Sequence, residues 1–363
     1  MPGPAVEGVS VGADTVPTDR LESDGTLAWD STTCVVVEIS AGDETGLGYT
    51  YGHQAVATLV SDKIAPLLEG RDAFQIGEAW WAVVGALRNQ GRPGITSMAV
   101  SAVDIALWDL KARLLGCSVA TLLDGFHDGV PVYGSGGFTS YAIEHLQSQL
   151  ARWVEQGIPR VKMKVGRHPE EDTARVRAAR AAIGDDVELY VDANGAWKRK
   201  QALEAMQTFA EFGVSWVEEP VTSDDLAGLR LLRDRGPAGM DVTAGEYGYD
   251  LPYFRDMLRA GAVDCMQADV TRCGGITAVQ RVSALCDAET IDLSAHCAPA
   301  ISAHAFTAVW HLRHLEYFHD HIRVEERLFD GLPEQRGGML RVDHDRPGLG
   351  LELKRSDAEQ YAA

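Results

Sequence analysis

The chain has 363 residues, of which 45% are hydrophobic and 24% are charged, and these ordinary values exclude a disordered or collagen-like protein. Its 33 basic and 53 acidic residues give a formal net charge of −20, so phosphate backbones and anionic membrane surfaces would repel it. We therefore expect neither a nucleic acid nor a membrane among its partners.

Targeting signals and cysteine pairs are not evident. No stretch approaches the roughly 20 apolar residues that a membrane-spanning helix requires, and the first residues lack the basic opening and apolar core of a secretory signal. The six cysteines are scattered without a CxxC pair, which favours free thiols in a reducing compartment. We therefore expect a cytoplasmic protein.

The first third of the chain mixes strand-like runs with helical patterns. The clearest helix is predicted from Ser97 to Leu115, where apolar residues lie three or four apart and Gly116 follows as a stop. Residues 15–32 are rich in turn formers and lack periodicity. This composition predicts a long loop, of the kind that often forms a lid or a binding element.

From residue 130 onward, short β-branched runs alternate with helical stretches such as 170–183 and 199–212. Eight such units in series predict a (β/α)8 barrel. The last interval is the shortest, and Gly- and Pro-containing turns follow it. We divide the chain into an N-terminal part (1–128), a barrel (129–320) and a tail (321–363) that returns to the N-terminal part.

Ionisable side chains stand where seven successive strands of this barrel end, which is the edge where barrel enzymes place their active sites. Each one alone could cap a helix or lie in an exposed turn. Together they are hard to explain in that way, because burying so many unpaired charges at one edge would be very costly. The polar residues at these strand ends are Lys162, Lys164, Asp192, Asn194, Glu218, Glu219, Glu246, Asp269, His296 and Glu316.

Three of these carboxylates form a candidate metal site. Asp192, Glu218 and Glu246 follow three consecutive strands, 26 and 28 residues apart, and neighbouring strands lie only about 4.8 Å from each other. Ligation by oxygen alone suits Mg²⁺, with Mn²⁺ or Ca²⁺ as alternatives. Three unrelated loop acids would be the alternative explanation.

Two lysines and a histidine are candidate acid/base groups. Lys162 and Lys164 lie two apart on one strand and so face the same side, where like charge and burial are expected to lower their pKa values. A phosphate held by two surface lysines is the alternative. Asp269 would fix the tautomer of His296 on the far side of the barrel. Cys297 is expected to point away from His296, and there is no GxSxG motif for a serine nucleophile.

These residues stand in segments that together resemble the enolase superfamily, and the Lys-x-Lys pair with the His-Asp pair resembles its mandelate racemase subgroup. The resemblance also includes SAVDIALWDLKARLLG at 101–116 and PGLG at 347–350, so it covers nearly the whole chain. The segments at the strand ends are KMK at 162–164, DAN at 192–194, WVEEP at 216–220, GE at 245–246, QADVTRCGG at 267–275, SAH at 294–296 and LE at 315–316.

The resemblance implies a modified TIM barrel, (β/α)7β, with an α+β capping domain formed from the N-terminal region and the C-terminal tail. It implies one Mg²⁺ in each active site, with Mn²⁺ possible, held by Asp192, Glu218 and Glu246. It also implies a homo-oligomer.

The resemblance further implies roles for the remaining residues. Lys164 and His296 would be the acid/base groups, with Lys162 as the electropositive neighbour of Lys164 and Asp269 as the partner of His296. The residues implied to contact substrate are Lys162, Asn194 and Glu316, the last through the substrate carboxylate.

Members of this superfamily remove the proton α to a carboxylate and form an enediolate. Positive charge must then neutralise the carboxylate where the new charge develops. With a β-hydroxyl on the substrate, the same step leads to dehydration of an acid sugar to a 2-keto-3-deoxy acid, which we expect first. Racemisation or epimerisation, and cycloisomerisation of a lactone or anhydro sugar acid, are the alternatives.

Two alternatives belong to other classes. A sugar-acid binding protein on a decayed enzyme scaffold is disfavoured by the intact set of candidate ligands and bases. A metal-dependent hydrolase would require His-rich zinc ligation, which the strand ends do not supply. Specificity is expected from the N-terminal part, where Arg20, Trp29, Tyr51 or His53 could contact the distal end of a substrate.

Overall fold

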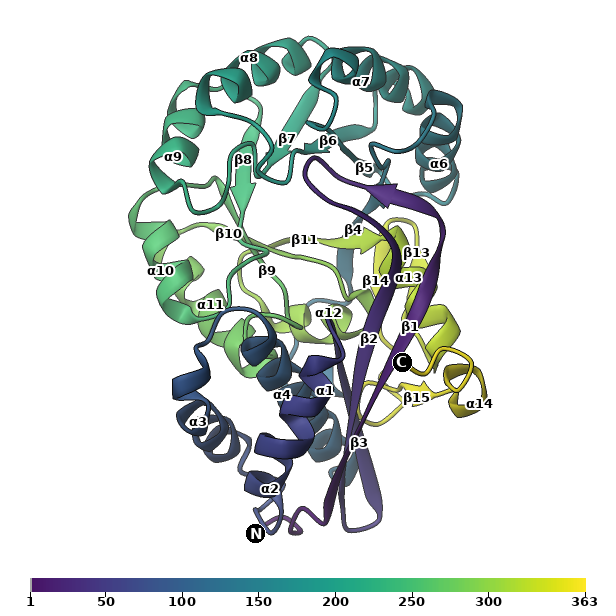
Figure 1. Ribbon diagram of the computed structural model, residues 1–363, viewed down its shortest axis with the longest axis vertical. Helices are drawn as coiled ribbons and strands as arrows, with labels where there is room; N and C mark the ends of the chain where they lie inside the picture. The colour runs from purple at the N-terminus through teal and green to yellow at the C-terminus, as the bar shows by residue number, and fades with distance from the viewer. Residues whose placement is uncertain (1) are drawn as a thin grey trace.

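An antiparallel sheet and a group of helices form the N-terminal part of the computed structural model, which describes residues 2–363 (Figure 1). The sheet has the order β1-β2-β3, with β1 at Gly8–Ser23, β2 at Ala28–Ala41 and β3 at Glu44–Tyr51. The helices that follow are α1 (Ala55–Leu59), the π-helical turn η1 (Val60–Ile64), α2 (Ala65–Leu68), α3 (Ile76–Ala86), the 3₁₀ turn η2 (Arg88–Gln90), α4 (Ile95–Leu114) and α5 (Val119–Leu122).

The expectation of a loop at residues 15–32 is wrong. This segment forms most of the β1–β2 hairpin, which extends from the cap along the barrel and turns at residues 24–27 (Figure 1). The hairpin runs beyond the sheet as a two-stranded ribbon with a register shift between Pro17 and Glu22. Neither face of such a ribbon is uniformly buried, so the sequence carries no alternation of apolar and polar residues.

The predicted helix at 97–115 is confirmed as α4, and it joins the cap to the barrel. Strand β3 lies directly on it, because a Cβ atom at Gly46 or Gly48 would overlap backbone atoms of α4. On its other side, the carboxylate of Asp104 accepts hydrogen bonds from the backbone N–H and hydroxyl of Thr277, at 2.9 and 2.6 Å. The cap is therefore fixed to the barrel by a buried polar contact as well as by apolar packing.

Eight parallel strands form the barrel, as the sequence predicts. They follow one another in chain order, and the last pairs with the first to close the barrel, with Leu315 opposite Val132. Their mostly buried runs are typical of parallel strands covered on both faces. The strands are β4 (Val130–Gly136), β5 (Arg160–Lys164), β6 (Glu188–Asp192), β7 (Val214–Glu218), β8 (Asp241–Ala244), β9 (Cys265–Ala268), β10 (Asp292–Ala295) and β11 (Leu312–Phe318).

Helices surround the barrel, and the short last unit agrees with a (β/α)7β arrangement. Between β10 and β11 the chain has room only for a seven-residue helix and one 3₁₀ turn. The outer helices are α6 (Ile143–Glu155), α7 (Pro169–Ile183), α8 (Arg199–Ala210), α9 (Leu226–Arg235), α10 (Leu251–Arg259), α11 (Ile276–Glu289) and α12 (Pro299–Ala305), followed by η3 (Phe306–Ala308).

The C-terminal tail returns to the cap, as expected. The backbone N–H of Thr15 donates to the carbonyl of Tyr361, and the N–H of Ala363 donates to the carbonyl of Ala13. The divisions at residues 128 and 320 stay predictions about domain limits. The elements that follow β11 are α13 (His319–Leu328), which begins two residues before the predicted tail, then β12 (Phe329–Asp330), β13 (Glu334–Arg336), β14 (Met339–Arg341), β15 (Glu352–Leu353) and α14 (Arg355–Ala358).

Among the helices within residues 2–363, none is both long and apolar enough to cross a membrane.

Candidate active site

A cavity of about 450 Å³, to which residues of the β1–β2 hairpin also contribute, is lined by five of the ten polar residues at the strand ends, namely Lys164, Asn194, Glu246, His296 and Glu316. All of them are buried except Asn194, which is half-buried. Backbone strain is concentrated here, because Asn194, Glu219 and Cys297 all have positive φ angles of 45°, 39° and 52°. Non-glycine residues adopt such angles rarely, and strained residues of this kind cluster at active sites.

The three candidate metal ligands lie on adjoining strand ends. Asp192 and Glu218 are direct partners in the β6–β7 register, and ligand oxygens of Glu218 and Glu246 lie within 4.8 Å of each other and of a ring nitrogen of His296. Glu218 Oε1 is buried and has no hydrogen-bond partner within the described chain. A buried carboxylate oxygen without a hydrogen-bond partner is costly unless a cation binds it, so this oxygen is consistent with a metal ligand.

Two further oxygens of these carboxylates, Asp192 Oδ2 and Glu218 Oε2, face the two lysines. Lys162 Nζ lies 2.5 Å from Glu218 Oε2 and 3.3 Å from Asp192 Oδ2. Lys164 Nζ lies 2.5 Å from Asp192 Oδ2. The lysines and the acids therefore form one continuous charge network.

The expectation that the lysine pKa values are lowered is wrong for the free protein. Burial alone would lower the pKa of Lys162, but Glu218 and Glu316 raise it well above its usual range. Burial likewise disfavours the charged form of Lys164, and Asp192 then raises its pKa above the usual value. The two like charges matter less than the carboxylates that surround them, which come from other strands.

Glu316 is held by the first strand of the barrel and by Lys162. Its Oε1 accepts a hydrogen bond from the hydroxyl of Ser135 at 2.5 Å and lies 2.7 Å from Lys162 Nζ. Burial would raise the pKa of Glu316, but Lys162 and His296 bring it below the usual value. An ionised Glu316 accepts hydrogen bonds, so a bond to a substrate carboxylate requires that one of the two carry a proton.

His296 has the predicted partner. Its Nδ1 donates to Asp269 Oδ2 at 2.8 Å, while Asp269 Oδ1 accepts from the N–H and the hydroxyl of Thr271, both at 2.7 Å. This arrangement leaves His296 Nε2 facing the cavity, 3.2 Å from Glu246 Oε2. Burial lowers the pKa of His296, but Cys297, Glu246 and Glu316 together raise it well above its usual range.

The prediction that Cys297 points away from His296 is wrong. Cys297 Sγ lies 3.4 Å from His296 Nε2 and 3.3 Å from Glu316 Oε2. The prediction assumed that the alternation of a strand continues past His296. Strand β10 ends at Ala295, and left-handed backbone at Cys297 and Ala298 turns the thiol into the cavity.

Of the four cap residues expected to contact the distal end of a substrate, three line the cavity. Trp29, Tyr51 and His53 line the cavity, whereas Arg20 is exposed and does not. Trp29 packs edge-on against Phe138, with ring centroids 5.5 Å apart. The cavity therefore combines the charged strand-end residues with aromatic side chains, which are Trp29, Tyr51, Tyr247 and Phe318.

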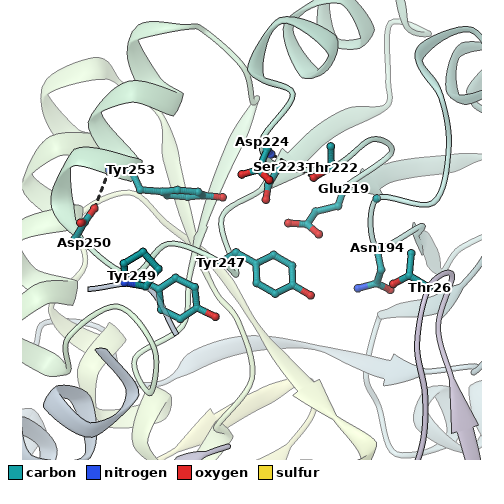
Figure 2. Close-up of a pocket in the computed structure, with 12 residues that line it drawn as sticks. Thr26, Asn194, Glu219, Thr222, Ser223, Asp224, Tyr247, Tyr249, Asp250 and Tyr253 are labelled. Atoms are coloured by element: carbon teal, nitrogen blue, oxygen red, sulfur yellow. Dashed lines mark hydrogen bonds between the residues drawn. The ribbon is translucent and has the colours of Figure 1, made fainter. Parts of the chain in front are cut away.

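A second pocket, of about 580 Å³, adjoins the cavity and shares Asn194 and Tyr247 with it. Figure 2 shows the Glu219 carboxylate pointing into this pocket, opposite Tyr247 and Tyr253. Glu219 Oε1 is buried without a hydrogen-bond partner among the described residues. In the sequence Glu219 lies between Glu218 and Pro220, where nothing distinguishes it from an ordinary turn residue. Its positive φ angle and its unpartnered oxygen are features of the structure alone.

Comparison with known proteins gives the family. Residues 23–124 match the N-terminal domain of the mandelate racemase/muconate lactonizing enzyme family. Residues 145–358 match the enolase C-terminal domain-like family.

Individual relatives cover nearly the whole chain. The 3,6-anhydro-α-L-galactonate cycloisomerase of Streptomyces coelicolor is 35% identical over 86% of this chain and 90% of its own length. A mandelate racemase/muconate lactonizing enzyme-like protein from Rubrobacter xylanophilus is 61% identical, with a TM-score of 0.98 over 99% of this chain and 100% of that one. The L-talarate/galactarate dehydratase of Salmonella typhimurium LT2, solved with Mg and L-lyxarohydroxamate, is 28% identical, with a TM-score of 0.92 over 99% of this chain and 93% of that one. The chain belongs to the mandelate racemase subgroup of the enolase superfamily.

Proposed function

We propose that this protein is a Mg²⁺-dependent dehydratase that removes the proton α to the carboxylate of an acid sugar and yields a 2-keto-3-deoxy acid. The observation that supports it is one cavity lined by Lys164, by the Asp-oriented His296 and by the carboxylates Glu246 and Glu316. A lysine and a histidine at separate strand ends give two proton-transfer groups for one bound carbon.

Asp192, Glu218 and Glu246 would hold the Mg²⁺, one ion for each active site. When bound, the ion supplies positive charge, which offsets these carboxylates and the charge that develops on the substrate carboxylate as its α-proton leaves. The unpartnered Glu218 oxygen and the all-oxygen donor set agree with this assignment.

The residues of the chain would then move two protons. Lys164 or His296 takes the α-proton, which leaves an enediolate. Protonated His296 gives a proton through Nε2 to the departing β-hydroxyl, so that a proton and hydroxide leave together as water. The enol that remains loses its hydroxyl proton and gains a proton at the β-carbon, which gives the 2-keto-3-deoxy acid. Lys162 keeps Glu316 in place through the 2.7 Å ion pair, and Asn194, whose buried Oδ1 has no partner in the described chain, would contact the α-substituent.

Cycloisomerisation of an anhydro sugar acid is the second candidate. The 35% identical relative named above is a cycloisomerase of a 3,6-anhydro sugar acid. Its ether oxygen is attached at the carbon β to the carboxylate, so removal of the α-proton can expel that ether instead of hydroxide. The aromatic side of the cavity at Trp29 and Phe318 suits a ring ether, which has no hydrogen to donate.

The test is a screen of the Mg²⁺-loaded protein against acid sugars and anhydro sugar acids. The 2-keto products are trapped with semicarbazide, and their masses are measured by mass spectrometry. Dehydration gives a product lighter by one water, whereas cycloisomerisation gives an isomer. Lys164→Ala and His296→Asn should each abolish the product. The proposal fails if no acid loses its α-proton, judged also by exchange in D₂O, and exchange without elimination would indicate a racemase or epimerase.

The homo-oligomer is tested separately by light scattering of the purified protein. A monomer at micromolar concentration would contradict it. Calorimetric titration of the metal-free protein with Mg²⁺, and then with Mn²⁺, should give one equivalent for each chain.

A further inference from the structure

A thiol, an imidazole and a carboxylate meet at one wall of the active-site cavity. The three atoms are Cys297 Sγ, His296 Nε2 and Glu316 Oε2, and all three side chains are buried. The sulfur lies 3.4 Å from the nitrogen and 3.3 Å from the oxygen, and the nitrogen and oxygen are 3.3 Å apart. The three atoms therefore form a nearly equilateral triangle.

This triangle is close in size to one face of a tetrahedral zinc site. With zinc lengths of about 2.3 Å to sulfur and about 2.0–2.2 Å to nitrogen and oxygen, a tetrahedron places the nitrogen and oxygen about 3.3–3.5 Å apart and the sulfur about 3.5–3.7 Å from each. The two contacts to sulfur therefore have to lengthen by at most about 0.4 Å. Mg²⁺ prefers six oxygens in an octahedron and does not select a thiolate. The three donor atoms therefore disfavour Mg²⁺, the ion proposed for Asp192, Glu218 and Glu246.

Neighbouring side chains and the local backbone hold the three ligands in place. His296 donates its other ring N–H to Asp269 at 2.8 Å, and such a bond fixes which nitrogen is free to bind a metal. Glu316 is held through its other oxygen by Ser135 and Lys162. Left-handed backbone at Cys297, with φ of 52°, directs the thiol inward.

We propose that Cys297, His296 and Glu316 form a second, inhibitory metal site for Zn²⁺ and similar thiophilic divalent ions. On binding, the thiol proton of Cys297 and the Nε2 proton of His296 are both released to solvent, and the cation gains bonds to sulfur, to the imidazole nitrogen and to the carboxylate, with water completing the tetrahedron. His296 Nε2 is then no longer free to exchange protons with a substrate. The inhibition rests on the proposed function, whereas metal binding at this site does not.

Cobalt(II) titration tests the site without any measurement of turnover. The full-length protein is first saturated with Mg²⁺, so that the oxygen site is filled, and Co²⁺ is then added. We expect an intense near-ultraviolet thiolate-to-cobalt absorption that saturates at one equivalent and disappears when Zn²⁺ is added. Octahedral cobalt bound by oxygen alone gives no such band.

Matched variants locate the thiolate. Cys297→Ser should lose the band, and Cys117→Ser should keep it, because Cys117 is a partly exposed free cysteine that does not line the cavity. Asp269→Asn should keep the band but weaken Co²⁺ binding about 10–100-fold, as expected when the partner of a ligating histidine is removed. Absence of the band from the unmodified protein would overturn the proposal, whatever the folding of the variants, and so would an undiminished band in Cys297→Ser.

Inhibition is measured where a substrate has been identified. With Mg²⁺ in excess, Zn²⁺ should inhibit the unmodified protein at least ten times more strongly than Cys297→Ser, each relative to its own rate without zinc. Equal inhibition of the two would refute the inhibitory role. A cobalt band in a protein that turns over no acid would leave the metal site standing and count against the proposed function alone.

Discussion

Replacing Asp269 by Asn tests whether the orientation of His296 carries the proposed chemistry. In the native site Asp269 accepts from His296 Nδ1 through Oδ2 and from Thr271 twice through Oδ1. An Asn side chain can keep its carbonyl on Thr271, which leaves its NH₂ group facing Nδ1. Nδ1 must then accept, so the ring proton moves to Nε2 and the lone pair that faces the cavity is lost.

The expected cost follows from removing one acid/base group. Such a group contributes about 10²–10⁴-fold to rate, so Asp269→Asn should lower kcat by that factor. This corresponds to an activation free energy that is higher by about 3–5 kcal/mol. Because the side chain is nearly isosteric, KM should change less than kcat. The rate is measured as keto-acid formation, and loss of the α-proton is followed by NMR in D₂O.

Thr271→Val is the matched control. It removes only the hydroxyl bond to Asp269 Oδ1 and leaves the bond to His296 in place, so we expect a loss smaller than about tenfold. If Asp269→Asn retains a rate within about threefold of the native one, the tautomer reasoning is refuted. Equal losses in both variants would show that a general disturbance of the loop, and not the tautomer, is responsible.

Three further predictions concern stability. Burial raises the pKa of Glu325 to about 8. The folded protein therefore keeps a proton that the unfolded chain loses near pH 4.5. Between about pH 4.5 and pH 8 the free energy of unfolding should fall with rising pH, by up to about 1.4 kcal/mol per pH unit. Glu325→Gln should flatten this slope in urea unfolding, and an unchanged slope would contradict the assignment. Asp109 is buried and pairs with Arg113 at 2.8 Å. Replacing Asp109 by Ala should therefore lower the free energy of unfolding by about 3–5 kcal/mol. A shift of the urea midpoint that corresponds to less than about 1 kcal/mol would refute this. Mg²⁺ added to chelator-treated protein should raise Tm, by the equivalent of about 2.7 kcal/mol at 100 times Kd, and a Tm that does not respond to millimolar Mg²⁺ would count against the metal site.

The barrel was predictable because its signal is local. Each parallel strand is a short apolar run, and each is followed by a helix, so the spacing alone places eight strands and the polar residues at their ends. Asp192 and Glu218 illustrate this, since strand register alone brings them together. The cap hairpin was not predictable in the same way, because residues 15–32 form a ribbon without one consistently buried face.

The errors inside the site have non-local causes. The pKa of Lys164 depends on Asp192, which comes from the next strand, and no pattern around residue 164 reports that contact. The direction of Cys297 depends on a backbone angle that nothing in the sequence SAHCAP specifies. Glu219 was noted as a residue of a strand end, but its unpartnered oxygen and its pocket become visible only in three dimensions.

The closure of the barrel has a consequence for how the protein folds. Strand β11 pairs with β4, and this seam passes through the active site, because Ser135 on one side donates its hydroxyl to Glu316 on the other. The two residues are 181 positions apart, so their contact closes a long loop and carries a high entropic cost in an unfolded chain. A partly folded barrel that has not closed this seam would have most of its helices and strands but would lack the fixed position of Glu316. Recovery of secondary structure during refolding should therefore precede recovery of a competent site.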